Sequence, residues 1–168
     1  SDNGAAIQAP LEVLKSNGNL RGRKALLYEG GIRIPFIVNQ KGKVAVQTLD
    51  NLIYFPDLLP TLANLADATV PENLNGMNIL PLFYGKEADT NNRMLYWEFP
   101  GKQVAARKGD WKVVSTKKDA PLELYNLKED ISETNNLAEQ HPEIVEKLKK
   151  EMKEMRSPSP NWPLPEDE

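Results

Sequence analysis

Three segments between residues 93 and 127 constrain the fold most strongly, because each is rich in aromatic or β-branched side chains and ends at a turn signal. They read "RMLYWEF" (93–99), "QVAARKGDWKVVST" (103–116) and "LELYNL" (122–127), separated by "PGK" and "KKDAP". Short runs of this kind predict an antiparallel meander of three or four strands. The turn signal Lys108-Gly109-Asp110 lies inside the middle segment, which is therefore expected to be a hairpin itself.

The sequence after the meander predicts one amphipathic helix over about residues 142–156. Apolar residues recur there at helical spacing while lysine and glutamate cover the rest, so we expect the apolar stripe to lie on the sheet. The stripe consists of Ile144, Val145, Leu148, Met152 and Met155. His141, the only histidine, precedes Pro142 and is interpreted as a capping or surface residue. The proline-rich tail after the helix predicts an extended strap or a loose end.

The first half of the chain predicts elements of an α/β sheet domain, but too few to complete one. The run "IPFIV" (34–38) is apolar on both faces and predicts a strand that is covered on each side. Leucines at helical spacing predict a helix from Pro56 or Asp57 to about residue 66, and "NGMNILPLF" predicts a loop with one helical turn. Because a buried strand needs neighbouring strands, we expect residues 1–85 to pack against something larger.

The composition excludes several classes of function. The chain has 168 residues, and its 21 basic and 24 acidic residues give a net charge of −3, which argues against a nucleic-acid partner. No apolar run approaches the length of a membrane span. The absence of cysteine excludes a thiolate nucleophile or thiolate metal site, and a single histidine excludes a cluster of imidazole ligands.

Four stretches together resemble the C-terminal part of the sulfatases, in the alkaline-phosphatase-like superfamily. They are "SDNG" at the start, "GRKALLYEGGIRIPFIV", "DLLPTLANLADATVPENLNGMNILPLF", and a last stretch from "RMLYWEF" through "ELYNL" and "ETNNLA". The resemblance implies an α/β fold class. Residues 1–89 are expected to be the incomplete end of a sulfatase catalytic domain. Residues 90–168 are expected to be a small antiparallel-sheet subdomain with one packed helix.

The resemblance also implies roles in the active site for three residues. Asp2 and Asn3 match ligands of a divalent cation, usually calcium, and a carboxylate with an amide oxygen suits such a hard cation. Lys24 matches a catalytic, substrate-binding lysine that contacts the sulfate ester as a point charge. Plainer alternatives remain open, because Asn3-Gly4 is also a common turn dipeptide and most loop lysines are solvated.

The rest of the motif around Lys24 is interpreted as structural. Residues 20–33 are glycine-rich and charged, and they predict an irregular loop. Gly30 and Gly31 are expected to adopt backbone angles closed to other residues, and Glu29 with Arg33 to form an ion pair or a loop brace. The same structural reading covers Tyr28 and Pro35.

Aromatic residues of the predicted meander are interpreted as its core. These are Trp97, Trp111 and Tyr125. The loop of residues 98–103 varies with substrate in the family, so the resemblance suggests that it lines the mouth of a substrate pocket.

The sulfatase nucleophile is missing from this sequence. In the family it is a formylglycine made within a "C/S-x-P/A-x-R" motif, and no stretch of this chain matches that motif. We therefore expect the formylglycine upstream of Ser1, in an N-terminal sulfatase region, and we expect this chain alone to be inactive. The substrate implied is a sulfated small molecule or glycan, and the location implied by the family is periplasmic or secreted.

Three alternatives remain open at this point. The parent protein could hydrolyse phosphonate or phosphate esters, because the nucleophile region that would decide is absent. The chain could instead be a non-catalytic subunit or interaction module that completes a separate N-terminal chain. It could also be a truncated piece that self-associates through an exposed apolar surface.

Overall fold

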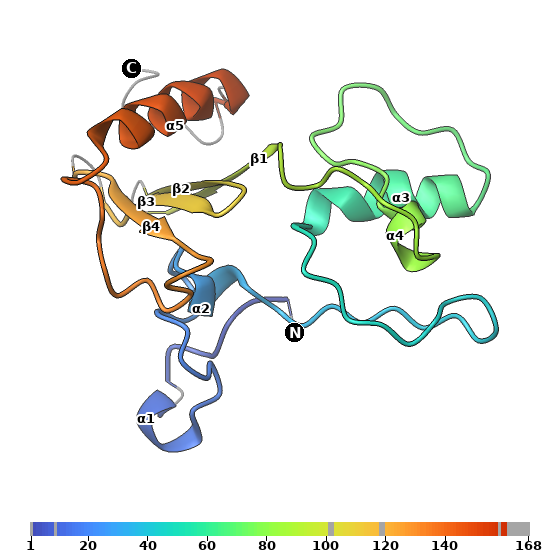
Figure 1. The fold of residues 1–168 in the computed structure, drawn as a ribbon, viewed down its shortest axis with the longest axis horizontal. Coiled ribbons are helices and arrows are strands. Elements are labelled where there is room, and N and C mark those ends of the chain that lie inside the picture. Colours follow the sequence, from blue (N-terminus) through green and yellow to red (C-terminus); the bar gives the residue numbers. More distant parts are fainter. Residues whose placement is uncertain (1, 9, 101–102, 118–119, 158, 161–168) are drawn as a thin grey trace. The chain divides into compact units, whose positions relative to one another are not determined.

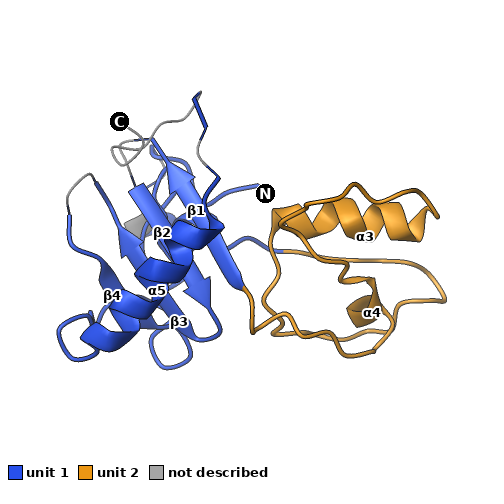
Figure 2. Ribbon diagram, turned by 90° about the horizontal axis from the view of Figure 1, so that it is seen from above, with its two compact units in different colours: residues 1–35, 94–168 blue, residues 36–93 orange. Residues whose placement is uncertain are grey.

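A computed structural model of the chain describes residues 2–8, 10–100, 103–117, 120–157 and 159–160. It divides into two compact units, one formed by residues up to 35 together with those from 94 onward, the other by residues 36–93 (Figure 2). The domain division expected at residue 89 refers to a larger catalytic domain, which contacts within this chain do not test. That division stays a prediction.

The C-terminal part of the first unit contains the predicted meander. Its antiparallel strands lie in the order β1-β2-β3-β4 (Figure 1). They are β1 (Met94–Phe99), β2 (Gln103–Lys108), β3 (Trp111–Ser115) and β4 (Glu123–Asn126). The predicted hairpin is confirmed, because β2 and β3 are joined by Gly109 and Asp110 alone. Gly109 has a φ of 57°, a left-handed value that only glycine adopts without cost.

Helix α5 (Pro142–Met155) covers one face of this sheet, as its apolar stripe predicted (Figure 1). Leu148 and Met152 are buried on the sheet, and the remaining members of the stripe pack around them. His141 takes the N-cap position but its side chain makes no capping hydrogen bond. Its ring instead lies edge-on to Trp111, with ring centroids 5.4 Å apart. The capping interpretation of His141 is therefore wrong, and its surface interpretation fits a partly exposed side chain.

The opposite face of the sheet is covered by the segment of residues 20–33, which the sequence analysis did not place there. Neighbouring strand residues alternate between the two faces, so each face carries its own apolar cluster. The first cluster contains Leu27, Tyr28, Ala105, Val114, Tyr125 and Leu127, and the second contains Met94, Ala106, Val113, Leu124, Leu148 and Met152. The sheet is therefore buried on both sides, by α5 and by the loop segment.

Two short helices interrupt the N-terminal part of the first unit. They are α1 (Leu11–Leu14) and α2 (Glu29–Ile32). Helix α2 lies inside the segment predicted as wholly irregular, and three of its four residues are buried. The tertiary contacts of the segment, rather than its glycine-rich sequence, account for this helical turn.

The second unit contains the predicted helix and helical turn. The 3₁₀ turn η1 (Phe55–Asp57) leads into α3 (Leu58–Leu65), and α4 (Leu80–Phe83) follows a long loop. Pro60 lies in the first turn of α3, where its missing N–H breaks no helical hydrogen bond. The buried apolar residues of this unit are Leu52, Pro60, Ile79 and Leu82.

The prediction of a buried strand over residues 34–38 is wrong for this structure. The segment forms no strand, and the Phe36 and Ile37 side chains are 44% and 88% exposed. The physical reason is that a strand is held by hydrogen bonds to a neighbour, and the four described strands all belong to the C-terminal meander. None of the described helices is long and apolar enough to span a membrane.

Candidate functional site

Three backbone segments of the first unit meet around the motif that contains Lys24. The Gly4 N–H donates to the Gly31 carbonyl at 2.9 Å, and the Lys24 N–H donates to the Ala5 carbonyl at 3.0 Å. The Asn17 side chain fastens the same region, because its Nδ2 donates to the Gly22 carbonyl at 2.6 Å and its Oδ1 accepts the Ala5 N–H at 3.3 Å. The segment that begins with the predicted metal ligands is thus hydrogen-bonded directly to the segment of the predicted catalytic lysine.

Glycine is required at positions 30 and 31 by close approach, not by backbone angle. Positive φ values occur at other glycines of the described chain, and Gly30 and Gly31 are not among them. A Cβ at Gly31 would lie 1.9 Å from the Leu26 carbonyl oxygen, and one at Gly30 would lie 2.5 Å from the Arg21 carbonyl oxygen. The expected reason for this glycine pair was therefore wrong, since backbone packing leaves no room for a side chain.

The three predicted site residues differ in their exposure. The side chains of Asp2 and Lys24 are exposed, and Asn3 is half-buried. Lys24 makes no ion pair among the residues that the structure describes. An exposed lysine ammonium can receive an anion, but the described geometry does not identify one.

Asp2 and Asn3 fit a calcium ion in the kind of donor but not in number. Calcium takes roughly six to eight oxygen ligands, and these two side chains supply a carboxylate and an amide oxygen. Among the described residues, no group of three or more acidic, histidine or cysteine side chains is placed to hold a metal ion. Most of a calcium coordination sphere would have to come from elsewhere.

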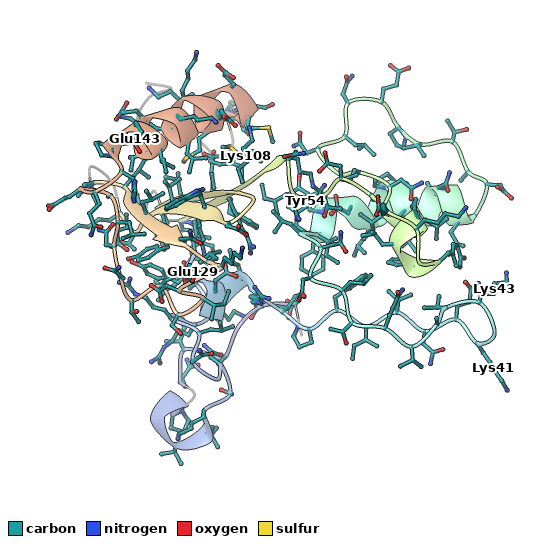
Figure 3. All side chains as sticks on the ribbon, in the orientation of Figure 1. Lys41, Lys43, Tyr54, Lys108, Glu129 and Glu143 are labelled. Atoms are coloured by element: carbon teal, nitrogen blue, oxygen red, sulfur yellow. The ribbon has the colours of Figure 1, made fainter. Side chains whose placement is uncertain are left out.

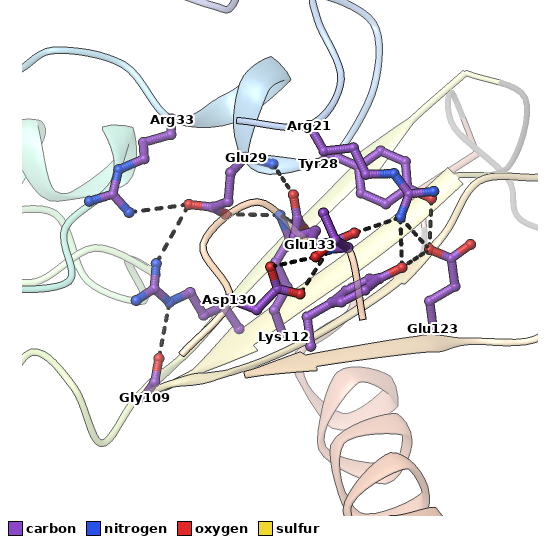
Figure 4. Close-up of polar contacts among 12 residues, drawn as sticks. Arg21, Tyr28, Glu29, Arg33, Gly109, Lys112, Glu123, Asp130 and Glu133 are labelled. Carbon is purple, nitrogen blue, oxygen red and sulfur yellow. Dashed lines mark hydrogen bonds and ion pairs between the residues drawn. The ribbon is translucent and has the colours of Figure 1, made fainter. Parts of the chain in front are cut away.

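A buried ionic cluster lies between the sheet and the segment of residues 20–33, which we call the motif loop (Figure 4). Lys112 on β3 has a fully buried side chain, and its Nζ lies 2.9 Å from Glu29 Oε1 and 2.8 Å from Glu133 Oε1. The contact with Glu29 is a hydrogen bond, whereas the contact with Glu133 Oε1 is an ion pair without hydrogen-bond geometry. The Glu29 N–H donates to the other carboxylate oxygen of Glu133 at 2.6 Å. Glu29 is thus held by its backbone and by its side chain.

Two arginines complete the charge balance around Glu29. Arg33 Nη1 lies 3.3 Å from Glu29 Oε2, which confirms the predicted ion pair. Arg107 Nη1 lies 3.8 Å from the same oxygen. Arg107 and Lys112 face each other across β2 and β3, so two cations would repel one another there without a carboxylate between them. The two-residue turn at Gly109 and Asp110 fixes this cross-strand pairing, so the pairing of Arg107 with Lys112 follows from the sequence once the hairpin is recognised.

The pKa values of the two buried carboxyl groups move in opposite directions. Burial alone would raise the pKa of Glu29, but the charge and hydrogen bond of Lys112, helped by Arg107 and Arg33, hold that pKa below its ordinary value. Burial raises the pKa of Glu133 above its ordinary value, and Lys112 opposes this only in part. Glu29 is therefore the carboxylate that the cluster stabilises in its charged form.

The loop after β4 is shaped to present Glu133 to the cluster. Glu133 has a φ of 53°, an uncommon conformation for a residue with a long side chain. The Asp130 carboxylate accepts the N–H groups of Thr134 and Asn135, each at 2.8 Å. Burial slightly disfavours the charged form of Asp130, but these backbone hydrogen bonds outweigh it and lower the pKa of Asp130. The "DISETNN" stretch therefore has a structural role.

A second polar cluster joins the motif loop to β4. The Arg21 guanidinium stacks on the Tyr28 ring at 3.9 Å from its centroid and donates to the Tyr125 hydroxyl at 2.7 Å. The hydroxyls of Tyr28 and Tyr125 donate to one oxygen of Glu123, at 2.7 and 2.6 Å. Burial and the hydrogen bonds to Glu123 raise the pKa values of both tyrosines, which are neutral at all physiological pH values. Tyr28 is therefore structural, as predicted.

The remaining sequence predictions have mixed outcomes. Tyr125 is 2% exposed and belongs to the core, while Trp97 and Trp111 are partly buried against it. In the loop of residues 98–103, Glu98 binds the Tyr96 hydroxyl and Arg156, and Gln103 donates to the Ala25 carbonyl. Residues 101–102 lie outside the described residues. A role of this loop at a pocket mouth stays a prediction.

The chain is similar to known proteins over most of its length. The family described as N-sulphoglucosamine sulphohydrolase, C-terminal, matches residues 22–158. This chain belongs to the sulfatases, as their C-terminal portion. The match includes Lys24 and begins after Asp2 and Asn3, so it leaves the predicted metal ligands outside the matched residues.

Two relatives and one solved structure agree with membership of the sulfatases. An uncharacterized sulfatase of Escherichia coli, YdeN, is 27% identical over 88% of this chain and 33% of its own length. The N-acetylgalactosamine-6-O-sulfatase of Bacteroides thetaiotaomicron is 33% identical over 78% of this chain and 29% of its own length. A structure from work on glycosaminoglycan metabolism by B. thetaiotaomicron has a TM-score of 0.79 at 31% identity, covering 92% of this chain and 37% of that chain.

This sulfatase chain spans 33% and 29% of the length of these two curated relatives. The expected α/β class, with a small antiparallel sheet and one packed helix at its end, is confirmed by the structure and by its structural relative. The roles of Lys24, Asp2 and Asn3 are not tested by these similarities and stay predictions.

Proposed function

We propose that this chain is the C-terminal part of an enzyme that hydrolyses sulfate esters, in which Lys24 contacts the sulfate group and Asp2 and Asn3 bind a calcium ion. The observation that carries the proposal is the hydrogen bond from the Lys24 N–H to the Ala5 carbonyl, 3.0 Å long. It sets the backbone of the lysine beside the segment that starts with the two oxygen donors. In a sulfatase, this juxtaposition fits one anion-binding site.

The chemistry of these side chains suits a sulfate ester. The exposed ammonium of Lys24 is a compact point charge that can follow the negative charge on the non-bridging oxygens. A bound divalent cation would neutralise charge on the same group of oxygens. Asp2 and Asn3 would hold it with part of its oxygen ligands, and the N-terminal sulfatase region would complete the set.

The nucleophile of the proposed reaction lies outside this chain. No "C/S-x-P/A-x-R" motif occurs among the 168 residues, so the formylglycine belongs to the N-terminal sulfatase region in this proposal. The 168-residue chain by itself is therefore expected to turn over no sulfate ester.

Exposed apolar side chains of the second unit support a large neighbouring structure. Phe55, Leu59 and Leu62 recur at helical spacing along η1 and α3, and they are 56%, 52% and 56% exposed. Isolated exposed apolar residues are ordinary, but a row of them on one helix indicates a surface that is covered in the complete protein. We assign the N-terminal sulfatase region as the cover, since relatives have about two further thirds of chain. Self-association of the isolated chain through this row is the expected consequence of removing that cover.

The relatives support a sulfated sugar as the substrate class, and the resemblance to the sulfatases implied an exported protein. One relative is named for a sulfated amino sugar, and a similar structure comes from work on glycosaminoglycans. We extend both features to this chain as proposals: its substrate is a sulfated glycan, and its location is the periplasm or the exterior.

Lys24→Ala in the full-length sulfatase tests the role of the lysine. The expected result is a loss of kcat/KM of about 10²- to 10³-fold on 4-nitrophenyl sulfate and on a sulfated amino sugar, because one charge that stabilises the transition state is removed. Lys43→Ala is the matched control, since Lys43 is another exposed loop lysine (Figure 3) and is expected to change kcat/KM less than twofold. Unchanged turnover in Lys24→Ala would refute the proposed role. Faster turnover of an aryl phosphonate than of the sulfate would favour the phosphonate hydrolase instead.

Calcium binding by Asp2 is tested separately from activity. Asp2→Ala in the full-length protein is expected to weaken calcium binding at least tenfold in isothermal titration calorimetry, because the only carboxylate of the Asp2-Asn3 pair is lost. Asp67→Ala removes an exposed carboxylate from the second unit and should leave the affinity unchanged. Equal affinity in wild type and Asp2→Ala would exclude Asp2 as a ligand.

A further inference from the structure

We propose that Lys112 is a positioning residue for Lys24: the buried cluster of Glu29, Lys112 and Glu133 fixes the motif loop, and thereby the place at which Lys24 meets the sulfate. This inference rests on the proposed function of Lys24. It assigns a role in the reaction to residues of the C-terminal sheet and its following loop.

The burial of Lys112 indicates a role beyond stability. Its side chain is fully buried, as is that of Glu133, and the Glu29 side chain is 4% exposed. Desolvating such charges is so unfavourable that an apolar replacement of an entire buried ion cluster is often as stable. What the charges add is a defined geometry, because each Glu29 oxygen faces its own cation: Oε1 lies 2.9 Å from Lys112 Nζ and Oε2 lies 3.8 Å from Arg107 Nη1.

Glu29 is fixed at two points, which leaves α2 little freedom to rotate or shift. Its side chain is held from β3 by Lys112, and its N–H is held by the Glu133 carboxylate at 2.6 Å. Glu133 holds the loop a second time, because its backbone carbonyl accepts a hydrogen bond from Arg21 Nη1 at 2.9 Å. The motif loop is therefore attached at both ends to the loop that follows β4 (Figure 4).

A short series of backbone contacts leads from this cluster to Lys24. The Gly30 N–H, next to Glu29, donates to the Arg21 carbonyl at 2.7 Å. The Gly31 carbonyl accepts the Gly4 N–H, and the neighbouring Ala5 carbonyl accepts the Lys24 N–H. The Gly31 backbone also packs closely against the Leu26 carbonyl, which restricts movement of the backbone between these contacts. A displacement of Glu29 is therefore expected to move the backbone at Lys24.

The decisive experiment is a double-mutant cycle in the full-length sulfatase with Lys112→Met and Lys24→Ala. Lys112→Met alone is expected to lower kcat/KM on 4-nitrophenyl sulfate by about 10- to 100-fold, since a displacement of about 1 Å at a reacting group costs this much. In the Lys24→Ala background the same change is expected to cost less than twofold, because the group that it positions is gone. If the loss of kcat/KM in the double variant equals the product of the losses in the two single variants, the proposal is overturned.

Two further variants keep the test independent of folding. Glu133→Gln retains the shape of the side chain but removes the negative charge that faces Lys112 Nζ at 2.8 Å, so it replaces Lys112→Met in the cycle if that variant does not fold. Lys108→Met removes a 2.6 Å ion pair with Glu151 that joins β2 to α5 on the opposite face of the sheet. This control is expected to change kcat/KM less than twofold in either background, and a loss equal to that of Lys112→Met would overturn the proposal.

Amide hydrogen exchange separates failure of this inference from failure of the proposed function. Glu133→Gln and Lys112→Met are expected to speed exchange at least tenfold at the amides of Lys24, Gly30 and Gly31, while the amides of the β1–β2 ladder keep their protection. If Lys24→Ala leaves activity unchanged, the role of Lys24 fails but the exchange result still decides whether the cluster fixes the loop. Unchanged exchange at these three amides would overturn the positioning role.

Discussion

The Arg93 guanidinium meets the buried Asp57 carboxylate through two hydrogen bonds, 2.5 and 2.6 Å long. The same carboxylate accepts the backbone N–H groups of Tyr54 and Met77, at 3.0 and 2.9 Å. Arg93 also donates to the Leu52 carbonyl at 3.0 Å. One ion pair therefore joins the start of η1, the loop before α4 and the end of the second unit.

Asp57→Asn is expected to destabilise the second unit by about 3–5 kcal/mol, because Arg93 would lose its counter-ion at a buried site. Urea denaturation monitored by hydrogen exchange of residues 36–93 measures this change. The exposed ion pair of Lys149 and Glu146, 3.4 Å long, provides the control, and Glu146→Gln is expected to cost about 0.5 kcal/mol or less. Similar losses in the two variants would contradict a special role for the Asp57 pair.

Thr61→Val is expected to cost about 1–3 kcal/mol in the free energy of unfolding of the second unit. The Thr61 hydroxyl donates to the Asp57 carbonyl at 2.6 Å and accepts the Ile79 N–H at 3.0 Å, and valine would leave that buried N–H unpaired. Thr61→Ser keeps the hydroxyl and is expected to lower the free energy of unfolding less than Thr61→Val does. Chemical denaturation of the three proteins checks the order, and a more stable valine variant would show that the hydroxyl bridge is not required.

Gly31→Ala is expected to destabilise the first unit by about 2–3 kcal/mol or more, because the new methyl group would overlap the Leu26 carbonyl oxygen. Gly18→Ala is the comparison: nothing lies within 4 Å of its Cβ position, and only its φ of 59° opposes the substitution. That backbone penalty is about 1–2 kcal/mol. Thermal denaturation followed by circular dichroism compares the variants, and a smaller loss for Gly31→Ala than for Gly18→Ala would contradict the close packing.

Glu29→Gln is expected to make the free energy of unfolding less dependent on pH in the acid range. The folded pKa of Glu29 lies below its ordinary value of 4.5, so its contribution to stability is present above about pH 4.5 and is lost as the pH falls through the folded pKa. The contribution of Glu133 to the pH dependence of stability has the opposite sign. Its pKa is raised in the folded protein, so protonation of this carboxyl group in acid increases the free energy of unfolding. The difference between wild type and Glu29→Gln should therefore be largest near neutral pH and shrink in acid.

Urea denaturation of both proteins between pH 3 and pH 7 measures this difference. The substitution removes one carboxyl group and leaves the three basic residues around it in place, so the pH-dependent part of the difference reports Glu29. A difference that does not depend on pH would show that Glu29 contributes only through packing.

The local sequence pattern was sufficient to predict those elements that are stabilised by neighbours close in the sequence. The alternation along residues 93–127, the two-residue turn at Gly109 and the stripe that contains Leu148 predicted the meander and its helix. The strand expected at residues 34–38 failed because its hydrogen-bonding partners are not among the described strands. Apolar composition indicates a buried segment, but it cannot supply the partner that makes the segment a strand.

The sequence by itself determined which family this chain belongs to, a meander of three or four strands, and the candidate residues Asp2, Asn3 and Lys24. Only the tertiary structure decided that the motif loop covers the second face of the sheet, and that Glu29 is held from a distance by Lys112 and Glu133. The ion pair with Arg33 was predictable because it spans four residues. The pair with Lys112 was not, because its 83-residue separation is closed only when the sheet has formed.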